Sequence, residues 1–304
     1  MTRHFLSMFD FTPEEILTLV GRAKELRGGR GKQGGFPTPL AGKTVALIFE
    51  KASTRTRVSF EVGVHELGGH PMFVSAKDSQ LGRGEPIRDT ARVLSRYVHM
   101  IMLRTFSQDT LVGLAKHGTI PVINGLSDLL HPCQVMSDLQ TVAEQKGEPL
   151  DRWRYAWVGD GNNMANSWIE AAGQLRLDLR LACPPGYRPN EAILAEARKR
   201  GGKIEVVDRP ADAVAGADVV NTDVWASMGQ EAEAEKRRKA FDGYLVDDGL
   251  MAKAAPNAIF LHCLPAHRGE EVTAEVIEGP HSRVWDQAEN RLHMQKAIME
   301  FLAR

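Results

Sequence analysis

Cysteine is scarce in this chain of 304 residues, which contains only Cys133, Cys183 and Cys263. Three scattered thiols do not form a disulfide framework, so we expect a protein of the reducing cytoplasm. Long apolar runs are also missing: none approaches the ~18 residues of a membrane span. The first twenty residues carry acidic groups, unlike a signal or transit peptide. These features predict a soluble chain with no membrane partner.

An excess of basic charge is missing too. Lys and Arg total 38 and Asp and Glu total 39, which leaves the net charge near zero. Proteins that bind nucleic acid usually show a basic excess or a basic patch. We therefore expect no nucleic-acid partner.

Short apolar runs alternate along the chain with stretches of helical periodicity, such as 107–117 and 163–176. This alternation is typical of βαβ units and of mostly parallel sheet, so we predict an α/β fold. The length suffices for two such lobes, and the polar segment 144–154 is the expected junction. The runs expected to form strands are 44–49, 70–75, 99–104, 120–126, 155–160, 179–184, 203–208, 217–224 and 258–265.

The run STRTR, residues 53–57, holds three hydroxyl groups and two guanidinium groups between an expected strand and an expected helix. Backbone N–H groups and the dipole at a helix N-terminus favour an anion, and Arg55 adds a fork of donors that matches phosphate. The alternative is an ordinary helix cap followed by surface arginines. The density of donors favours a phosphate site.

Polar side chains follow two further strands. Arg104 ends one strand, and HPCQ places His131 and Gln134 just after another. In open α/β sheets, ligands bind outside the carboxyl ends of strands. An arginine, an imidazole and an amide there are suited to hold a carbonyl oxygen and a phosphate oxygen together, although His131 alone could be a packed or capping residue.

The segment VGDGNNMANS resembles a dinucleotide loop only in part, because Met164 stands where a third glycine is required. Asn162 and Asn163 then have two interpretations, a helix cap or an amide that contacts a substrate.

Asp223, in NTDVWASMGQE, ends a strand and suits a cationic amine, or else caps a helix. The glycine and polar residues after it indicate a mobile loop.

The run FLHCLPAHRGEEV ends a buried strand with His262 and Cys263, and His267 follows. Their spacing matches no standard zinc ligand set, so we predict no metal. No base is evident beside Cys263 for a nucleophilic role. A thiol or backbone carbonyl that contacts substrate is the more modest interpretation.

Together these stretches resemble the carbamoyltransferase family, and within it the members that act on ornithine. STRTR is similar to the carbamoyl phosphate motif, HPCQ to the HPxQ signature, and ENRLHMQKAIM, residues 289–299, to the region of the final helix. The ornithine-specific SMG loop and the cysteine motif HCLP are matched by SMG at 227–229 and by HCLP at 262–265. The matches follow the family's order from residue 50 to 299.

The resemblance implies two Rossmann-like lobes, each a mostly parallel sheet flanked by helices. Residues 1–146 would bind carbamoyl phosphate, residues 147–286 would bind ornithine, and the C-terminal helix at 287–304 would pack back on the first lobe. The implied reaction transfers the carbamoyl group to the δ-amine of L-ornithine, giving L-citrulline and phosphate without a cofactor. The family also implies a homotrimer with active sites shared between subunits.

The resemblance assigns each role to numbered residues. Catalysis would involve Arg55, Arg104, His131 and Cys263. Carbamoyl phosphate would be bound by Ser53, Thr54, Arg55, Thr56, Gln80, Arg104, His131, Gln134, Cys263, Leu264 and Arg291, with Gln80 reaching into a neighbouring subunit. Ornithine would be bound by Asn163, Asp223, Ser227 and Met228.

Overall fold

The computed structural model describes residues 2–30, 37–75, 84–226 and 233–304. The sites predicted at Gln80, Ser227 and Met228 lie outside these ranges. The chain forms two compact units: the first comprises Met1–Gln140 and Glu289–Arg304, and the second comprises Thr141–Ala288. The chain passes between the units within two helices, α5 and α12.

The first unit contains a four-stranded parallel sheet in the order β2-β1-β3-β4. Its strands are β1 (Thr44–Phe49), β2 (His70–Ser75), β3 (Met100–Arg104) and β4 (Val122–Leu126). Its helices are η1 (Met8–Asp10), α1 (Pro13–Gly28), α2 (Thr54–Glu66), α3 (Ile87–Tyr97) and α4 (Gln108–His117), together with the start of α5 (Pro132–Gln145) and most of α12 (Val284–Leu302).

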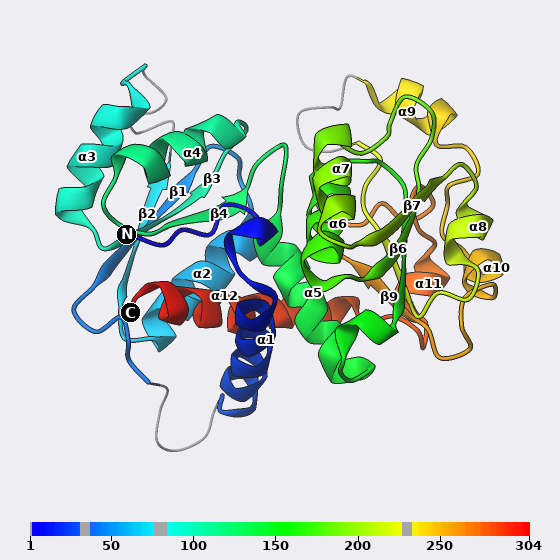
Figure 1. Cartoon of the computed structure of the whole chain (residues 1–304), viewed down its shortest axis with the longest axis horizontal. Coiled ribbons are helices and arrows are strands. Elements are labelled where there is room, and N and C mark those ends of the chain that lie inside the picture. The colour runs from blue at the N-terminus through cyan, green and yellow to red at the C-terminus, as the bar shows by residue number, and fades with distance from the viewer. Residues whose placement is uncertain (1, 31–36, 76–83, 227–232) are drawn as a thin grey trace. The chain divides into compact units, whose positions relative to one another are not determined.

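Helices cover both faces of this sheet (Figure 1). Ala46, Ile48 and Leu103 pack on one face in a cluster with Ala91 of α3 and Leu111 of α4. Helices α2 and α12 lie on the other face (Figure 1).

The contact between α2 and α12 depends on Gly63. A Cβ at this position would lie only 3.2 to 3.6 Å from side-chain atoms of Met299, Lys296 and Leu292. The absence of a side chain at Gly63 therefore lets the C-terminal helix approach the helix that begins with the STRTR run.

The second unit contains a five-stranded parallel sheet in the order β7-β6-β5-β8-β9. Its strands are β5 (Arg154–Val158), β6 (Asp178–Ala182), β7 (Lys203–Val207), β8 (Val219–Thr222) and β9 (Ile259–His262). Its helices are η4 (Leu150–Arg152), α6 (Asn163–Leu175), α7 (Glu191–Lys199), α8 (Pro210–Val214), α9 (Ala234–Ala240), α10 (Asp248–Met251) and α11 (Ala274–Glu278).

The second sheet is also covered on both faces. Helices α6 and α7 lie on one side, while α8, α10 and α11 lie on the other (Figure 1). Val158, Val220 and Phe260 form a core cluster with residues of the latter helices, such as Val214 and Ile277. The carboxyl ends of β5, β8 and β9, three neighbouring strands, therefore meet along one edge of the sheet.

The predicted α/β architecture is confirmed. Each of the nine expected strand runs forms a strand, the described pairings are parallel, and the C-terminal helix packs on the first unit. In the described part of the chain, no helix has both the length and the apolar character needed to cross a bilayer.

Candidate active site

The STRTR run forms the N-terminus of α2, directly after β1. Ser53 is the N-cap, and its Oγ accepts a hydrogen bond from the backbone N–H of Thr56 at 3.3 Å. Ser53 Oγ also donates to Thr56 Oγ1 at 3.1 Å. Ser53 therefore caps the helix, as the alternative interpretation expects, and the cap lies among further donors. Thr54 is exposed, Arg55 is half-buried and Thr56 is buried.

Arg291, on α12, links this helix N-terminus to α5. Its Nη2 donates to Thr56 Oγ1 at 2.6 Å, and its Nη1 donates to Gln134 Oε1 at 2.7 Å. The Nε2 of Gln134 donates in turn to Asp138 Oδ1 at 2.8 Å. Arg291 is 4 % exposed and Gln134 is 1 % exposed. A buried charge is costly unless it is paired and hydrogen-bonded. The hydrogen bonds of Arg291 offset that cost, and these residues form a buried polar network.

His131 precedes α5 and is buried beside three guanidinium groups. Burial holds the pKa of the His131 imidazole well below its ordinary value, and the positive charges of Arg291, Arg104 and Arg55 lower it further. The imidazole is therefore neutral at pH 7, with one N–H to donate and one nitrogen to accept. A neutral donor among cations is suited to polarise a carbonyl oxygen.

In the second unit, Asp223 lies at the carboxyl end of β8 and is largely buried. Its Oδ1 accepts from Cys263 Sγ at 3.1 Å, and its Oδ2 accepts from Asn162 Nδ2 at 2.9 Å. Asn162 also caps α6, because its Oδ1 accepts from the backbone N–H of Met164 at 2.9 Å. Asn162 is thus both a cap and a partner of Asp223, while Asn163 is the first residue of α6, which begins beside this cluster.

A buried acid–imidazole pair supports the HCLP segment. His262 Nδ1 accepts from the backbone N–H of Leu264 at 2.9 Å, so Nε2 carries the proton and donates to Glu271 Oε1 at 3.1 Å. The side chains of His262 and Glu271 are fully buried. Leu264 has a φ of 59°, a left-handed conformation uncommon for a residue with a Cβ. The hydrogen bond from its N–H holds that conformation beside Cys263.

Asp160 and Arg237 form a second buried pair near the same edge of the sheet. Arg237 Nη1 donates to Asp160 Oδ2 and to the backbone oxygen of Trp225, each at 2.7 Å. Burial raises the pKa of Asp160 to about 6, although Arg237 opposes the rise and Asp223 adds to it. The pair joins the loop after β5 to the segment after β8, and these segments also carry Asn162 and Asp223.

Two groups of potential metal ligands occur among the described residues: Asp223 with His262 and Cys263, and His267 with Glu270 and Glu271. In the first group both ring nitrogens of His262 are engaged, with Leu264 N–H and with Glu271. Because His262 needs an unprotonated, unoccupied nitrogen to bind a metal, this group serves better as a hydrogen-bonded cluster.

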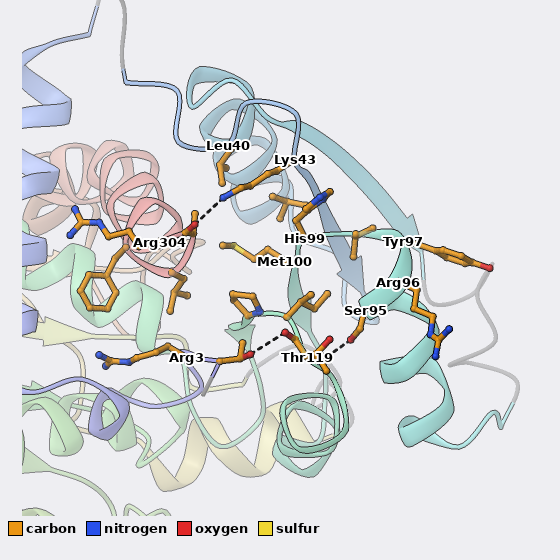
Figure 2. A pocket seen from close by; sticks show the side chains of 18 residues that line it. Arg3, Leu40, Lys43, Ser95, Arg96, Tyr97, His99, Met100, Thr119 and Arg304 are labelled. Atoms are coloured by element: carbon orange, nitrogen blue, oxygen red, sulfur yellow. Dashed lines mark hydrogen bonds between the residues drawn. The ribbon is translucent and has the colours of Figure 1, made fainter.

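A separate cavity of about 650 Å³ opens at the amino-terminal edge of the first sheet (Figure 2). Lys43 lines it together with apolar side chains such as Leu40 and Met100. Lys43 Nζ donates to the backbone oxygen of Ala303 at 2.8 Å, and so it caps the C-terminal end of α12. None of the described residues predicted for the active site lines this cavity. Its basic side chains complement the negative ends of helices there.

The structure thus collects most of the predicted residues into one group per unit. Ser53, Thr56, Gln134 and Arg291 are connected by hydrogen bonds, and His131 lies in the field of three arginines. Asp223 and Cys263 are in contact. Sequence reasoning missed the supporting residues Glu271, Asp160 and Arg237. Arg237 falls in the charged run 231–239, and no local pattern marks it as buried.

These features define an α/β protein with a buried cluster of arginine, imidazole and amide groups in one unit and a hydrogen-bonded carboxylate and thiol in the other. Residues 3–144 match the carbamoyl-P binding domain of aspartate/ornithine carbamoyltransferases, and residues 151–302 match their Asp/Orn binding domain. The chain belongs to the aspartate/ornithine carbamoyltransferase family.

Individual relatives agree over the full length. An ornithine carbamoyltransferase of Geobacter metallireducens is 57 % identical over 306 residues, with all of both chains covered. Among solved structures, ornithine carbamoyltransferase from Pyrococcus furiosus is 51 % identical with a TM-score of 0.93, and 98 % of this chain and 96 % of that one are covered. Anabolic ornithine carbamoyltransferase from Campylobacter jejuni is 43 % identical with the same TM-score, covering 99 % and 98 %. The resemblance inferred from the motifs is confirmed.

Proposed function

We propose that this chain transfers the carbamoyl group of carbamoyl phosphate to the δ-amine of L-ornithine, giving L-citrulline and phosphate. Membership of the family and the identity to full-length ornithine carbamoyltransferases support the reaction and both substrates. The observation that carries the site is the buried contact of Arg291 with Thr56 and Gln134, beside a neutral imidazole. The similar structure from Campylobacter jejuni is described as anabolic, which supports a role for this chain in arginine biosynthesis.

Carbamoyl phosphate binds the first domain, for which we propose residues 1–146 with the C-terminal helix at 287–304. The helix N-terminus, with Ser53, Thr54 and Thr56, holds the phosphate together with the guanidinium groups. The carbamoyl oxygen lies toward His131, whose neutral N–H stabilises negative charge on that oxygen as the amine attacks. The residues we assign to this substrate are Ser53, Thr54, Arg55, Thr56, Gln80, Arg104, His131, Gln134, Cys263, Leu264 and Arg291.

Ornithine binds the second domain, for which we propose residues 147–286. The Asp223 carboxylate attracts the cationic amine of ornithine, and the Cys263 thiol that hydrogen-bonds Asp223 lies beside the same group. Asn163, Ser227 and Met228 complete the ornithine site.

The δ-amine must be neutral to attack the carbonyl carbon. The C–N bond then forms as the C–O bond to phosphate breaks. The departing phosphate accepts the proton that the amine loses, so the reaction requires neither a metal nor another cofactor. Arg55, Arg104 and Arg291 stabilise the charge on the phosphate leaving group.

We propose a homotrimer in the cytoplasm, in which Gln80 reaches into the site of a neighbouring subunit. Exposed apolar side chains on the first unit support an interface: Val58 of α2, and Met72 and Phe73 of β2. Strand β2 lies at the edge of its sheet, and an exposed apolar edge is normally covered by a partner. The three cysteines are free, which agrees with a reducing compartment.

The test is citrulline formation by the purified protein from carbamoyl phosphate and ornithine, with aspartate, N-acetylornithine and putrescine as competing acceptors. Arg55→Ala should abolish most turnover, while the matched surface variant Arg209→Ala should behave as wild type, since Arg209 is exposed and forms its ion pair with the nearby Asp212. Product from another amine alone would overturn the role of Asp223. An active Arg55→Ala enzyme would refute the phosphate site.

Shared sites are tested by mixing subunits. Arg55→Ala and Gln80→Ala proteins, each nearly inactive, are dissociated and reassembled together. In mixed trimers some sites combine an intact Arg55 from one subunit with an intact Gln80 from its neighbour, so activity should return. No recovery in assemblies shown to be mixed would contradict sharing.

A further inference from the structure

Glu50 lies at the carboxyl end of β1, three residues before the helix cap Ser53. Its backbone N–H donates to the backbone oxygen of Arg104 at 2.9 Å. Its carboxylate oxygen Oε2 accepts from the hydroxyl of Thr105, and also from the backbone N–H of Phe106 at 3.4 Å. One side chain therefore joins the end of β1 to the two residues that follow Arg104.

The next residue extends this connection to a third segment. Lys51 Nζ forms an ion pair with the side chain of Asp128, and it lies 4.4 Å from the centre of the Phe106 ring. The Lys51 side chain is 9 % exposed. The backbone N–H of Asp128 donates to the backbone oxygen of Phe106 at 2.9 Å, and Asp128 stands three residues before His131.

We propose that Glu50 is a positioning residue for the carbamoyl phosphate site; the inference rests on the function proposed above. With Lys51, Thr105, Phe106 and Asp128 it forms what we call the strand-end clamp. The clamp fixes the relative positions of three segments that follow β1, β3 and β4. The first segment leads into the STRTR cap, the second directly follows Arg104, and the third leads into the His131–Gln134 region.

The physical need for such a clamp follows from the charges of the site. The positive charges of Arg55, Arg104 and Arg291 all act on the imidazole of His131, and like charges gathered around one position repel one another. Preorganised donors stabilise developing charge only if their supports hold them in place before the substrate arrives. Glu50 bonds to residues next to Arg104 rather than to the guanidinium itself. It supports the site without neutralising the charge that the phosphate requires.

A positioning role for Glu50 has a specific kinetic signature. Glu50→Ala should raise the KM for carbamoyl phosphate roughly tenfold, the scale of one lost hydrogen bond to a charged group. The KM for ornithine should stay within about twofold of wild type. Glu50→Gln retains an acceptor oxygen and should recover most of the affinity. Glu196→Ala, on α7 in the second unit, is the matched control because Glu196 forms its ion pair with Arg200, four residues away on the helix surface.

Thr105→Val tests the same contact from the other side, since it removes the hydroxyl and preserves the shape of a buried side chain. It should raise the KM for carbamoyl phosphate as Glu50→Ala does, and the double variant should be no worse than either single variant. Calorimetry with inorganic phosphate gives a second readout that needs no turnover, and Glu50→Ala should weaken phosphate binding by a similar factor.

The citrulline assay and the measurements on the variants test the proposed function and the role of Glu50 separately. Wild-type protein that forms no citrulline refutes the function, while phosphate affinities of the variants still test the clamp. An unchanged KM and unchanged phosphate affinity in Glu50→Ala refute the clamp. A parallel rise of both KM values with a lower melting temperature also overturns it, because that pattern indicates general loss of structure. Additive effects in the double variant likewise contradict action through Thr105.

Discussion

His131 makes the stability of the protein depend on pH in a direction that can be worked out. Burial and three neighbouring guanidinium groups hold the pKa of its imidazole well below the ordinary 6.5. In the unfolded chain the imidazole recovers that ordinary value, so the unfolded state binds a proton more readily than the folded state. Stability is therefore fully present above pH 6.5 and is lost as the pH falls below it.

The loss of stability caused by His131 is limited, because the imidazole takes up at most one proton. Each pH unit below the unfolded pKa costs at most about 1.4 kcal/mol of stability. Between pH 7.5 and 5.5, His131 therefore contributes a fall of up to about 1.4 kcal/mol in the free energy of unfolding. The variant His131→Asn removes this titration while keeping a polar residue that caps helices well at the start of α5.

The assay is urea unfolding of wild type and His131→Asn at pH 7.5 and 5.5, at one protein concentration. Titration of the other histidines is common to both proteins and cancels in the comparison. We expect wild type to lose about 1 kcal/mol more than the variant over this interval. An equal loss in both proteins would refute a depressed pKa. A greater loss in the variant would reverse the sign and remove the case for a neutral imidazole.

Three further predictions concern the second unit. Asp223→Asn should raise the KM for ornithine roughly thirtyfold, since loss of a charged partner costs about 2 kcal/mol, with little change in the KM for carbamoyl phosphate in the same steady-state assay. Glu271→Gln removes the charge that faces buried His262 and should lower the free energy of unfolding by about 1–3 kcal/mol in urea titrations; an unchanged midpoint would contradict its supporting role. Gly161→Ala should lower the melting temperature, because its Cβ would lie 2.2 Å from the backbone nitrogen of Pro189, whereas Gly21→Ala, in open space on α1, should not.

The fold was predictable because its strands are short and most of them, such as β1, β3, β8 and β9, are buried on both faces. A run such as TVALIF is almost continuously apolar when helices cover both sides, and β1 is buried from its second residue onward. The short helices α8, α10 and α11, of four or five residues, were not predicted. Their residues include Val214, Leu250 and Ile277, which belong to the core of the second unit. Helices this short are stabilised by tertiary packing, which local periodicity does not reveal.

Candidate site residues could be identified in the sequence where an apolar strand ends in polar residues, as at Arg104 and Asp223. Such a transition is visible in the sequence because a parallel strand presents its carboxyl end to the ligand. The choice between Asn162 and Asn163 was not resolvable from the pattern. Both stand at a helix start, and only the contact between Asn162 and Asp223, 61 residues apart in sequence, separates their surroundings.

The residues that support the site stand next to its motif residues in the sequence, although they are not part of the motifs. Glu50 and Thr105 join the ends of neighbouring strands, and Thr105 stands directly after Arg104. His262 likewise precedes Cys263 and bonds Glu271. Because successive residues at a strand end point to opposite sides, the neighbour of a ligand-binding residue is directed away from the ligand and into the protein. A polar neighbour there must find a buried partner, and that partner comes from another segment, the end of β3 for Glu50 and the turn before α11 for His262. The residues that hold a site in place are therefore expected beside its motifs, with partners that only the fold identifies.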